Sequence, residues 1–152
     1  MKKSLMAAGL AAVVTVLVSG AALAQAKPEI LVKQRQSAMT LIGKYWGPMA
    51  GMMQGKIPYD AAVVQRNAGF LDNLSRMPWD GFHESTRDVK SAALPNVFTD
   101  QAKFREAASR LENEASRLVQ VSRSGDEAAV KAQLGAVGKS CGGCHNDFRA
   151  KQ

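Results

Sequence analysis

The sequence predicts an all-α protein folded as an antiparallel four-helix bundle. Apolar residues recur at helical spacing through most of the chain, and no stretch keeps the alternation that is typical of a strand. Proline and glycine divide this pattern into four helical segments. Four amphipathic helices joined by three connections bury their apolar faces by packing against one another as a bundle.

The N-terminal residues have the pattern of a secretory signal peptide. Two lysines precede a short apolar run over residues 10–18, and a small-residue cleavage box ends at Ala24. The run is shorter than the roughly 20 residues that a membrane span requires. We therefore predict an exported, periplasmic protein with a cleaved signal peptide over residues 1–24 and no stable membrane anchor. Residues 25–152 are expected to form one domain.

The first two helices are predicted from their apolar spacing and from the residues at their ends. The first is expected from about Pro28, a residue favoured in a first helical turn, to about Gln54. Pro48 lies inside it and predicts a kink or an early end. The second is expected from Asp60, a suitable N-cap, to Met77, where a proline follows. The residues expected to face inward are Leu31, Ala38, Leu41, Ile42, Tyr45, Met49 and Met52 in the first helix, and Val63, Val64, Phe70, Leu71 and Leu74 in the second.

A long polar connection, from Trp79 to about Thr99, separates the two helical pairs. Connections of this length in small domains are usually functional and often wrap a ligand. The third helix is expected from Asp100 to Arg123, and the fourth begins after Asp126 as its N-cap. Their inward residues are Phe104, Ala108, Leu111, Ala115, Leu118 and Val121, then Val130, Leu134, Val137 and Phe148.

The charge and composition argue against nucleic-acid binding. Losing two lysines with the signal peptide lowers the formal charge of +7 to +5. Aromatic residues make up 6% of the chain, and no run of Arg and Lys interleaves with them. We expect most charges to lie on solvated helix faces and the rest to steer acidic redox partners.

The two cysteines lie in one tetrapeptide, Cys141-Gly142-Gly143-Cys144, which His145 follows directly. A disulfide inside so short a loop would clamp no distant segments, so the pair needs a chemical explanation. Residues three apart share a helix face, so both thiols can add to the two vinyl groups along one haem edge, and His145 can turn toward the iron. The motif therefore predicts one covalently bound haem c.

Two other interpretations of this motif remain open. A thioredoxin-like dithiol would follow a strand at the start of a helix, whereas this motif lies in the last helix without a βαβ unit. A structural zinc site needs four N or S ligands, and the remaining histidine, His83, lies far away in the long connection. The export signal also favours haem attachment, which bacteria complete outside the cytoplasm.

With this motif near the end of a four-helix bundle, the sequence resembles cytochrome c′ and the related low-spin class II cytochromes c. The resemblance covers nearly the whole of residues 25–152. It implies a periplasmic monohaem protein that carries electrons and binds nitric oxide and carbon monoxide. It also implies a homodimer through the first two helices, where Ile57 and Val64 are candidates for an exposed apolar face. The matching segments are Lys27-Pro28-Glu29, Arg35-Gln36-Ser37-Ala38, Pro58-Tyr59-Asp60-Ala61, residues 74–79 and residues 141–149.

The resemblance also implies roles for individual residues. Arg35 and Gln36 would lie at the haem edge, where Arg35 can neutralise a propionate with forked hydrogen bonds. Arg149 lies four residues beyond His145, which predicts the same helix face, and it matches a basic position in the proximal pocket. The alternatives are a solvated first-helix arginine and, for Arg149, a favourable contact with the helix dipole alone. Phe148 stands where relatives often have tyrosine.

Met39 decides the state of the iron. In cytochrome c′ an apolar residue at this position blocks the iron without binding it, whereas in the low-spin relatives a methionine there is the sixth ligand. Methionine is also an ordinary core residue. The context Arg35-Gln36-Ser37-Ala38 favours high-spin, five-coordinate iron, and the alternative is a low-spin electron-transfer cytochrome ligated by Met39. No enzyme is expected, because peroxidase chemistry requires polar distal acid–base groups, and around Met39 the first helix offers only Arg35 and Gln36.

Overall fold

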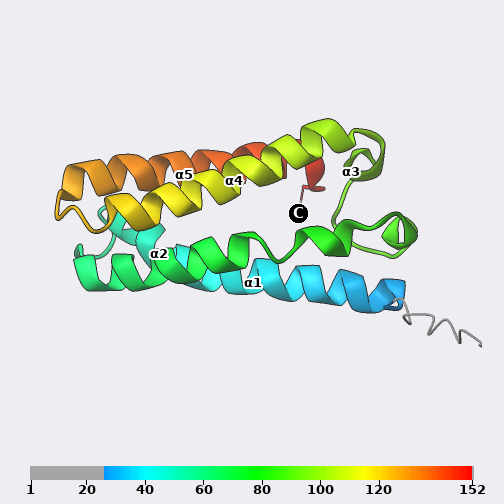
Figure 1. The fold of residues 1–152 in the computed structure, drawn as a ribbon, viewed down its shortest axis with the longest axis horizontal. Helices are drawn as coiled ribbons and strands as arrows, with labels where there is room; N and C mark the ends of the chain where they lie inside the picture. The colour runs from blue at the N-terminus through cyan, green and yellow to red at the C-terminus, as the bar shows by residue number, and fades with distance from the viewer. Residues whose placement is uncertain (1–25, 152) are drawn as a thin grey trace, which may run out of the picture.

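The computed structural model describes residues 26–151, so the predicted signal peptide lies outside the described residues. The four long helices are α1 (Pro28–Met53), α2 (Ala61–Ser75), α4 (Gln101–Val121) and α5 (Glu127–Phe148). Figure 1 shows them running alternately up and down, with α1 beside α2 and α4 beside α5. The predicted four-helix bundle is confirmed, and within residues 26–151 none of the helices combines the length and hydropathy that a bilayer crossing requires.

Aspartates set where three of the helices begin. Asp60, Asp100 and Asp126 each accept a hydrogen bond from the backbone N–H three residues on, at 3.0, 3.4 and 3.0 Å. Gly125, between α4 and α5, has a φ of 76°, a left-handed conformation that glycine adopts without steric cost. The caps predicted at Asp60 and Asp126 are confirmed, and the helices end within two residues of the predicted bounds.

Helix α1 continues through Pro48 to Met53, so the early end predicted from this proline is wrong. A proline removes the hydrogen bond that its N–H would donate to the carbonyl four residues earlier, here that of Lys44. Pro48 and Lys44 are both exposed, so water can solvate the freed carbonyl. The last turns stay helical because Met49 and Met52 are buried in the core.

The bundle core matches most of the predicted inward residues, with two exceptions, and it corrects one residue expected on an exposed face. Leu41 and Phe70 are 42% and 43% exposed, because each lies one residue, about 100° of helix rotation, from a buried neighbour. Phe70 instead stacks on Tyr45 on the outside of the α1–α2 pair, with ring centroids 4.5 Å apart. Val64 is fully buried and cannot belong to an exposed apolar face, whereas Ile57 is 43% exposed.

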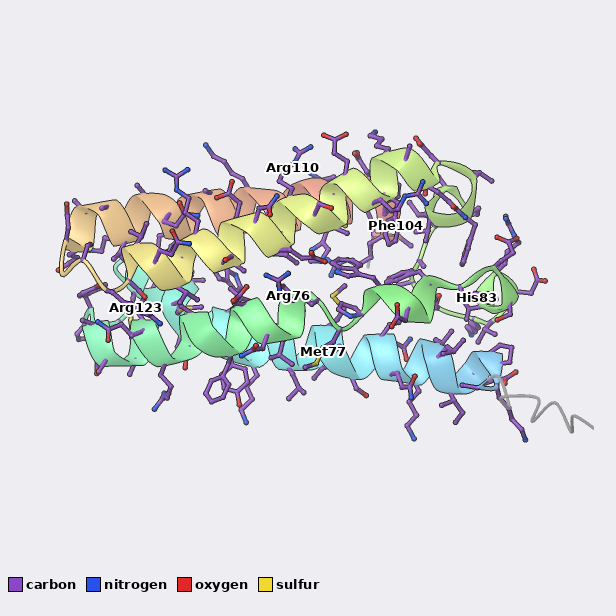
Figure 2. All side chains as sticks on the ribbon, viewed as in Figure 1. Arg76, Met77, His83, Phe104, Arg110 and Arg123 are labelled. Atoms are coloured by element: carbon purple, nitrogen blue, oxygen red, sulfur yellow. The ribbon has the colours of Figure 1, made fainter. Side chains whose placement is uncertain are left out.

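The connection between α2 and α4 forms three short helices, η1 (Trp79–Phe82), η2 (Glu84–Thr86) and α3 (Asn96–Thr99). It closes one end of the bundle with a second, largely aromatic cluster. The ring of Phe104 lies 4.8 Å from that of Phe82 and 5.2 Å from that of Phe148. Figure 2 shows Phe104 pointing from α4 into the space between the helix pairs, whereas Arg110 points outward.

The same connection is tied to the end of α5. The N–H of Leu94 donates to the carbonyl of Phe148 at 3.0 Å, and the N–H of Ala150 donates to the carbonyl of Ala92 at 2.9 Å. These two bonds form a short antiparallel pairing of residues 92–94 with residues 148–150. The connection is therefore held beside the helix that carries the cysteine motif.

Candidate functional site

A cavity of about 570 Å³ lies among α1, α4, α5 and the connection that follows α2. The structure brings every residue predicted for the site to its wall. Helix α1 and helix α5 supply these residues from two sides of the cavity, so segments more than 100 positions apart in the sequence meet there. The predicted residues that line the cavity are Arg35, Gln36, Met39, Cys141, Cys144, His145 and Arg149.

The last turns of α5 place both thiols and the imidazole on the cavity. Cys141 and Cys144 are free and partly buried. Burial raises the pKa of both thiols, and the neighbouring Cys141 and Asp147 raise that of Cys144 further. Burial, and then the positive charge of Arg149, lower the pKa of His145. The imidazole is therefore neutral at pH 7, the form whose ring nitrogen can ligate a metal.

Arg35 lies in the wall with 3% of its surface exposed. Its guanidinium donates to the carbonyl of Gly81, to Thr86 Oγ1 at 2.9 Å and to Ser91 Oγ at 2.9 Å, all in the connection. The group also lies over the ring of Phe82, 4.4 Å from the centroid. These bonds use three of its five N–H groups, and within residues 26–151 no carboxylate lies at ion-pair distance from it.

A second polar group of the wall lacks a partner. Trp79 lines the cavity, and its Nε1 is buried without a hydrogen bond among the described residues. Such a group costs free energy when no acceptor is present. The Arg35 guanidinium has no carboxylate partner and the Trp79 N–H has no acceptor among the described residues. Both residues line one cavity, so a bound group that carries carboxylates would suit it.

The rest of the wall is mostly apolar, and sequence reasoning missed most of it. Trp46 comes from α1, Phe82 from η1, and Leu111 from α4. Leu111 has a signal in the sequence, because it belongs to the apolar stripe of its helix. Trp79 and Phe82 have none, because only the fold of the connection brings them to the cavity.

Arg149 reaches the cavity differently from the sequence expectation. Helix α5 ends at Phe148, and Arg149 is extended, with φ −123° and ψ 131°. It therefore does not continue the helix face of His145, although its N–H still donates to the His145 carbonyl at 3.1 Å. Its side chain lines the same cavity and lowers the pKa of His145, so the two residues are neighbours.

Comparison with known proteins identifies the family. The family model described as cytochrome c′ matches residues 31–149. Cytochrome c′ from Halomonas halodenitrificans is 41% identical over 132 residues, which cover 83% of this chain and 100% of that one. The chain belongs to the cytochrome c′ family. Proteins of this family carry a covalently bound c-type haem, and so this protein is a haem cytochrome.

Solved structures of the family have the same fold. Cytochrome c prime from Shewanella frigidimarina is 31% identical, with a TM-score of 0.80 over 84% of this chain and 99% of that one. A nitric oxide complex of a mutant cytochrome c prime from Alcaligenes xylosoxidans is 36% identical, with a TM-score of 0.77 over 84% of this chain and 99% of that one. The residues that line the cavity fit a haem, because two thiols and a neutral imidazole lie there together with Arg35, which has no carboxylate partner within residues 26–151.

Proposed function

We propose that this cytochrome binds nitric oxide and carbon monoxide at a high-spin, five-coordinate haem and also carries single electrons. The observation that carries the proposal is the composition of the cavity wall. Helix α5 offers two thiols and one imidazole, whereas the α1 side offers only the sulfur of Met39 as a further atom that binds iron well. The nitric oxide complex of the related structure supports gas binding.

Cys141 and Cys144 hold the haem in this proposal. Each sulfur would be bonded to one vinyl carbon, with the thiol hydrogen added to the other carbon of that vinyl group. His145 would ligate the iron through a ring nitrogen that its lowered pKa keeps unprotonated. The bound haem supplies an iron that changes oxidation state by one electron and takes a diatomic ligand.

Arg35 and Trp79 receive the carboxylate end of the haem. Arg35 keeps two N–H groups beyond those that bind the connection, and Trp79 keeps one. A propionate would pair with the buried guanidinium and accept from the indole N–H, which removes the cost of both unpaired groups. Gln36 is exposed at the edge of the same cavity and can bind the outer propionate, and Arg149 stands on the proximal side near His145.

Met39 and Ile42 form the distal side from α1. Neither side chain donates a hydrogen bond, so a polar anion would lose its hydration there without compensation, whereas a neutral diatomic gas loses little. Selection for small uncharged ligands follows from this wall.

Export and assembly complete the proposal. The signal peptide over residues 1–24 directs the chain to the periplasm, where covalent haem attachment is completed and where redox partners exchange electrons with it. This helix pair has three apolar side chains that are each more than 40% exposed: Leu41 on α1, Ile57 in the connection between the two helices, and Phe70 on α2. A neighbouring apolar face on a second copy would cover them, and we propose a homodimer through these two helices.

A second candidate function is favoured by the presence of Met39 at the cavity. In it the Met39 sulfur is the sixth iron ligand and the protein is a low-spin electron carrier that binds gases weakly. The two candidates share the fold, the thioethers and the proximal histidine. They differ only in the bond between this sulfur and the iron.

The visible spectrum of the reduced mature protein tests the choice, together with two variants at one position. If the iron is five-coordinate, the spectrum is broad and high-spin, Met39→Leu leaves it unchanged, and Met39→Ala speeds carbon monoxide binding by removing bulk. If Met39 is a ligand, the wild type shows a narrow α band and both variants become high-spin. That second result would refute the five-coordinate proposal. Haem extracted by acid acetone would refute the covalent attachment.

A further inference from the structure

The wall that α1 gives to the cavity has a deep row and an exposed row. Met39, Ile42 and Trp46 are buried or half-buried. Gln36 and Gly43 are exposed, although they line the same cavity. An exposed residue in a cavity wall marks the rim, so the cavity opens to solvent along this edge of α1.

The seam between α1 and α5 is closed at one end of this edge. The indole of Trp46 packs over Gly138 of α5, so a Cβ at Gly138 would lie 3.3 Å from Cζ2 of Trp46. A side chain at position 138 would be crowded, so the glycine lets α1 and α5 approach closely here, and the indole fills the seam between them. The opening therefore lies on the N-terminal side of Trp46, where the next rim residue along α1 is Gly43.

Gly43 leaves this part of the rim without a side chain. A Cβ built on Gly43 would meet no atom within 4 Å outside its own helix turns. Its rim neighbour Thr40 has a hydroxyl that donates to the Gln36 carbonyl at 2.9 Å, so that polar group is satisfied within α1. The space beside Gly43 is therefore open.

We propose that Gly43 sets the width of the entrance through which small uncharged gases reach the distal side of the cavity. The inference rests on the proposed gas binding and adds the path to it. A side chain at position 43 would stand in this opening and slow passage in both directions. Because it would not touch the bound gas, association and dissociation should slow by the same factor and the dissociation constant should stay unchanged.

The chain offers a matched control in Gly47. It lies one turn further along α1, is exposed, and likewise has no atom within 4 Å of a built Cβ, but it does not line the cavity. Valine at either position replaces a helical glycine at a solvated site, so both variants should fold. Any difference between them then reports on the cavity opening.

The experiment compares Gly43→Val and Gly47→Val as mature haem proteins, each alone and combined with Met39→Ala. The Met39→Ala background leaves the distal position open whichever state the wild-type iron adopts. Carbon monoxide association is measured by rapid mixing and dissociation by displacement with nitric oxide. Ethyl isocyanide serves as a larger probe, and the dissociation constant and visible spectrum are recorded for every variant.

We expect Gly43→Val to lower both carbon monoxide rate constants about tenfold, the equivalent of about 1.4 kcal/mol in each barrier. The dissociation constant and spectrum should not change, ethyl isocyanide should be slowed more, and Gly47→Val should match its parent. Unchanged rates in Gly43→Val, a changed dissociation constant or an equal effect of Gly47→Val would overturn the entrance. If carbon monoxide binds only to variants that carry Met39→Ala, the five-coordinate proposal is refuted instead. The proposed entrance would still be supported if Gly43→Val slowed binding in the Met39→Ala protein.

Discussion

Truncating Leu118 to alanine tests the packing on which the haem cavity depends. Leu118 lies on α4 with its side chain fully buried in the bundle core, and it does not itself line the cavity. The substitution removes three carbons from a site that has no access to water. The cost combines lost transfer free energy with a new cavity, and for a leucine buried to this degree it is about 3–5 kcal/mol.

The neighbouring residue provides the control. Arg117 is exposed on α4, and its side chain makes no ion pair or hydrogen bond within residues 26–151, so Arg117→Ala should change the free energy of unfolding by less than about 0.5 kcal/mol. Urea unfolding of the mature haem protein, followed by helical circular dichroism, measures both. With an m-value of about 1–3 kcal/mol per molar, the Leu118 variant should lose roughly 1–5 M in its midpoint.

Two results would refute this reasoning. Equal losses at Leu118 and Arg117 would show that the rotational phase of α4 is wrong. A loss below about 1 kcal/mol for Leu118→Ala would show that the core can collapse around the missing atoms, against the close packing that protein interiors normally have. A changed m-value would point to an altered unfolded state instead, so both parameters are needed.

Three further predictions concern a cap, the cavity and the outer face. Asp126→Ala should lower the free energy of unfolding by about 1 kcal/mol because it removes the acceptor for the Ala129 N–H, and Asp126→Asn should restore most of it in the same urea titration. Trp79→Phe should destabilise the haem protein by about 1–3 kcal/mol if the indole N–H binds a propionate, whereas a neutral or stabilising effect would show that the N–H stays unpaired. Leu41→Arg should give a monomer in sedimentation velocity if α1 and α2 form the dimer, and an unchanged mass would exclude this face.

The helices could be predicted because their signals are local. Asp60 and Asp126 precede apolar stripes directly, and a side chain can cap only the helix that follows it. The stripe of α4 was predicted without error at its buried positions, because 21 residues of regular spacing fix the rotational phase. In α1 and α2 several apolar residues stand side by side, so spacing alone did not reveal that Leu41 and Phe70 face outward.

The cysteine motif could be predicted because its chemistry depends on spacing within one helix. The opposite wall could not, because Trp79 and Phe82 belong to a connection whose path no periodic pattern describes. Arg35 was assigned to the cavity by resemblance, but its hydrogen-bond partners lie 46 to 56 positions away. Arg149 left the predicted helix face because its backbone pairs with Ala93 at the end of α5.

At Arg35 the proposed function and the stability of the fold make opposite demands. The guanidinium is 3% exposed and has no carboxylate partner within residues 26–151. Burial removes its hydration and lowers the pKa of Arg35. The neutral hydrogen-bond acceptors around it replace that hydration only in part. An apolar side chain at this position would let α1 pack on the connection without a buried charge. The three hydrogen bonds to the connection hold α1 in place, but they leave the charge of Arg35 without a counter-ion. In the proposed function a haem propionate would supply that negative charge, in the same cavity that Cys141, Cys144 and His145 line.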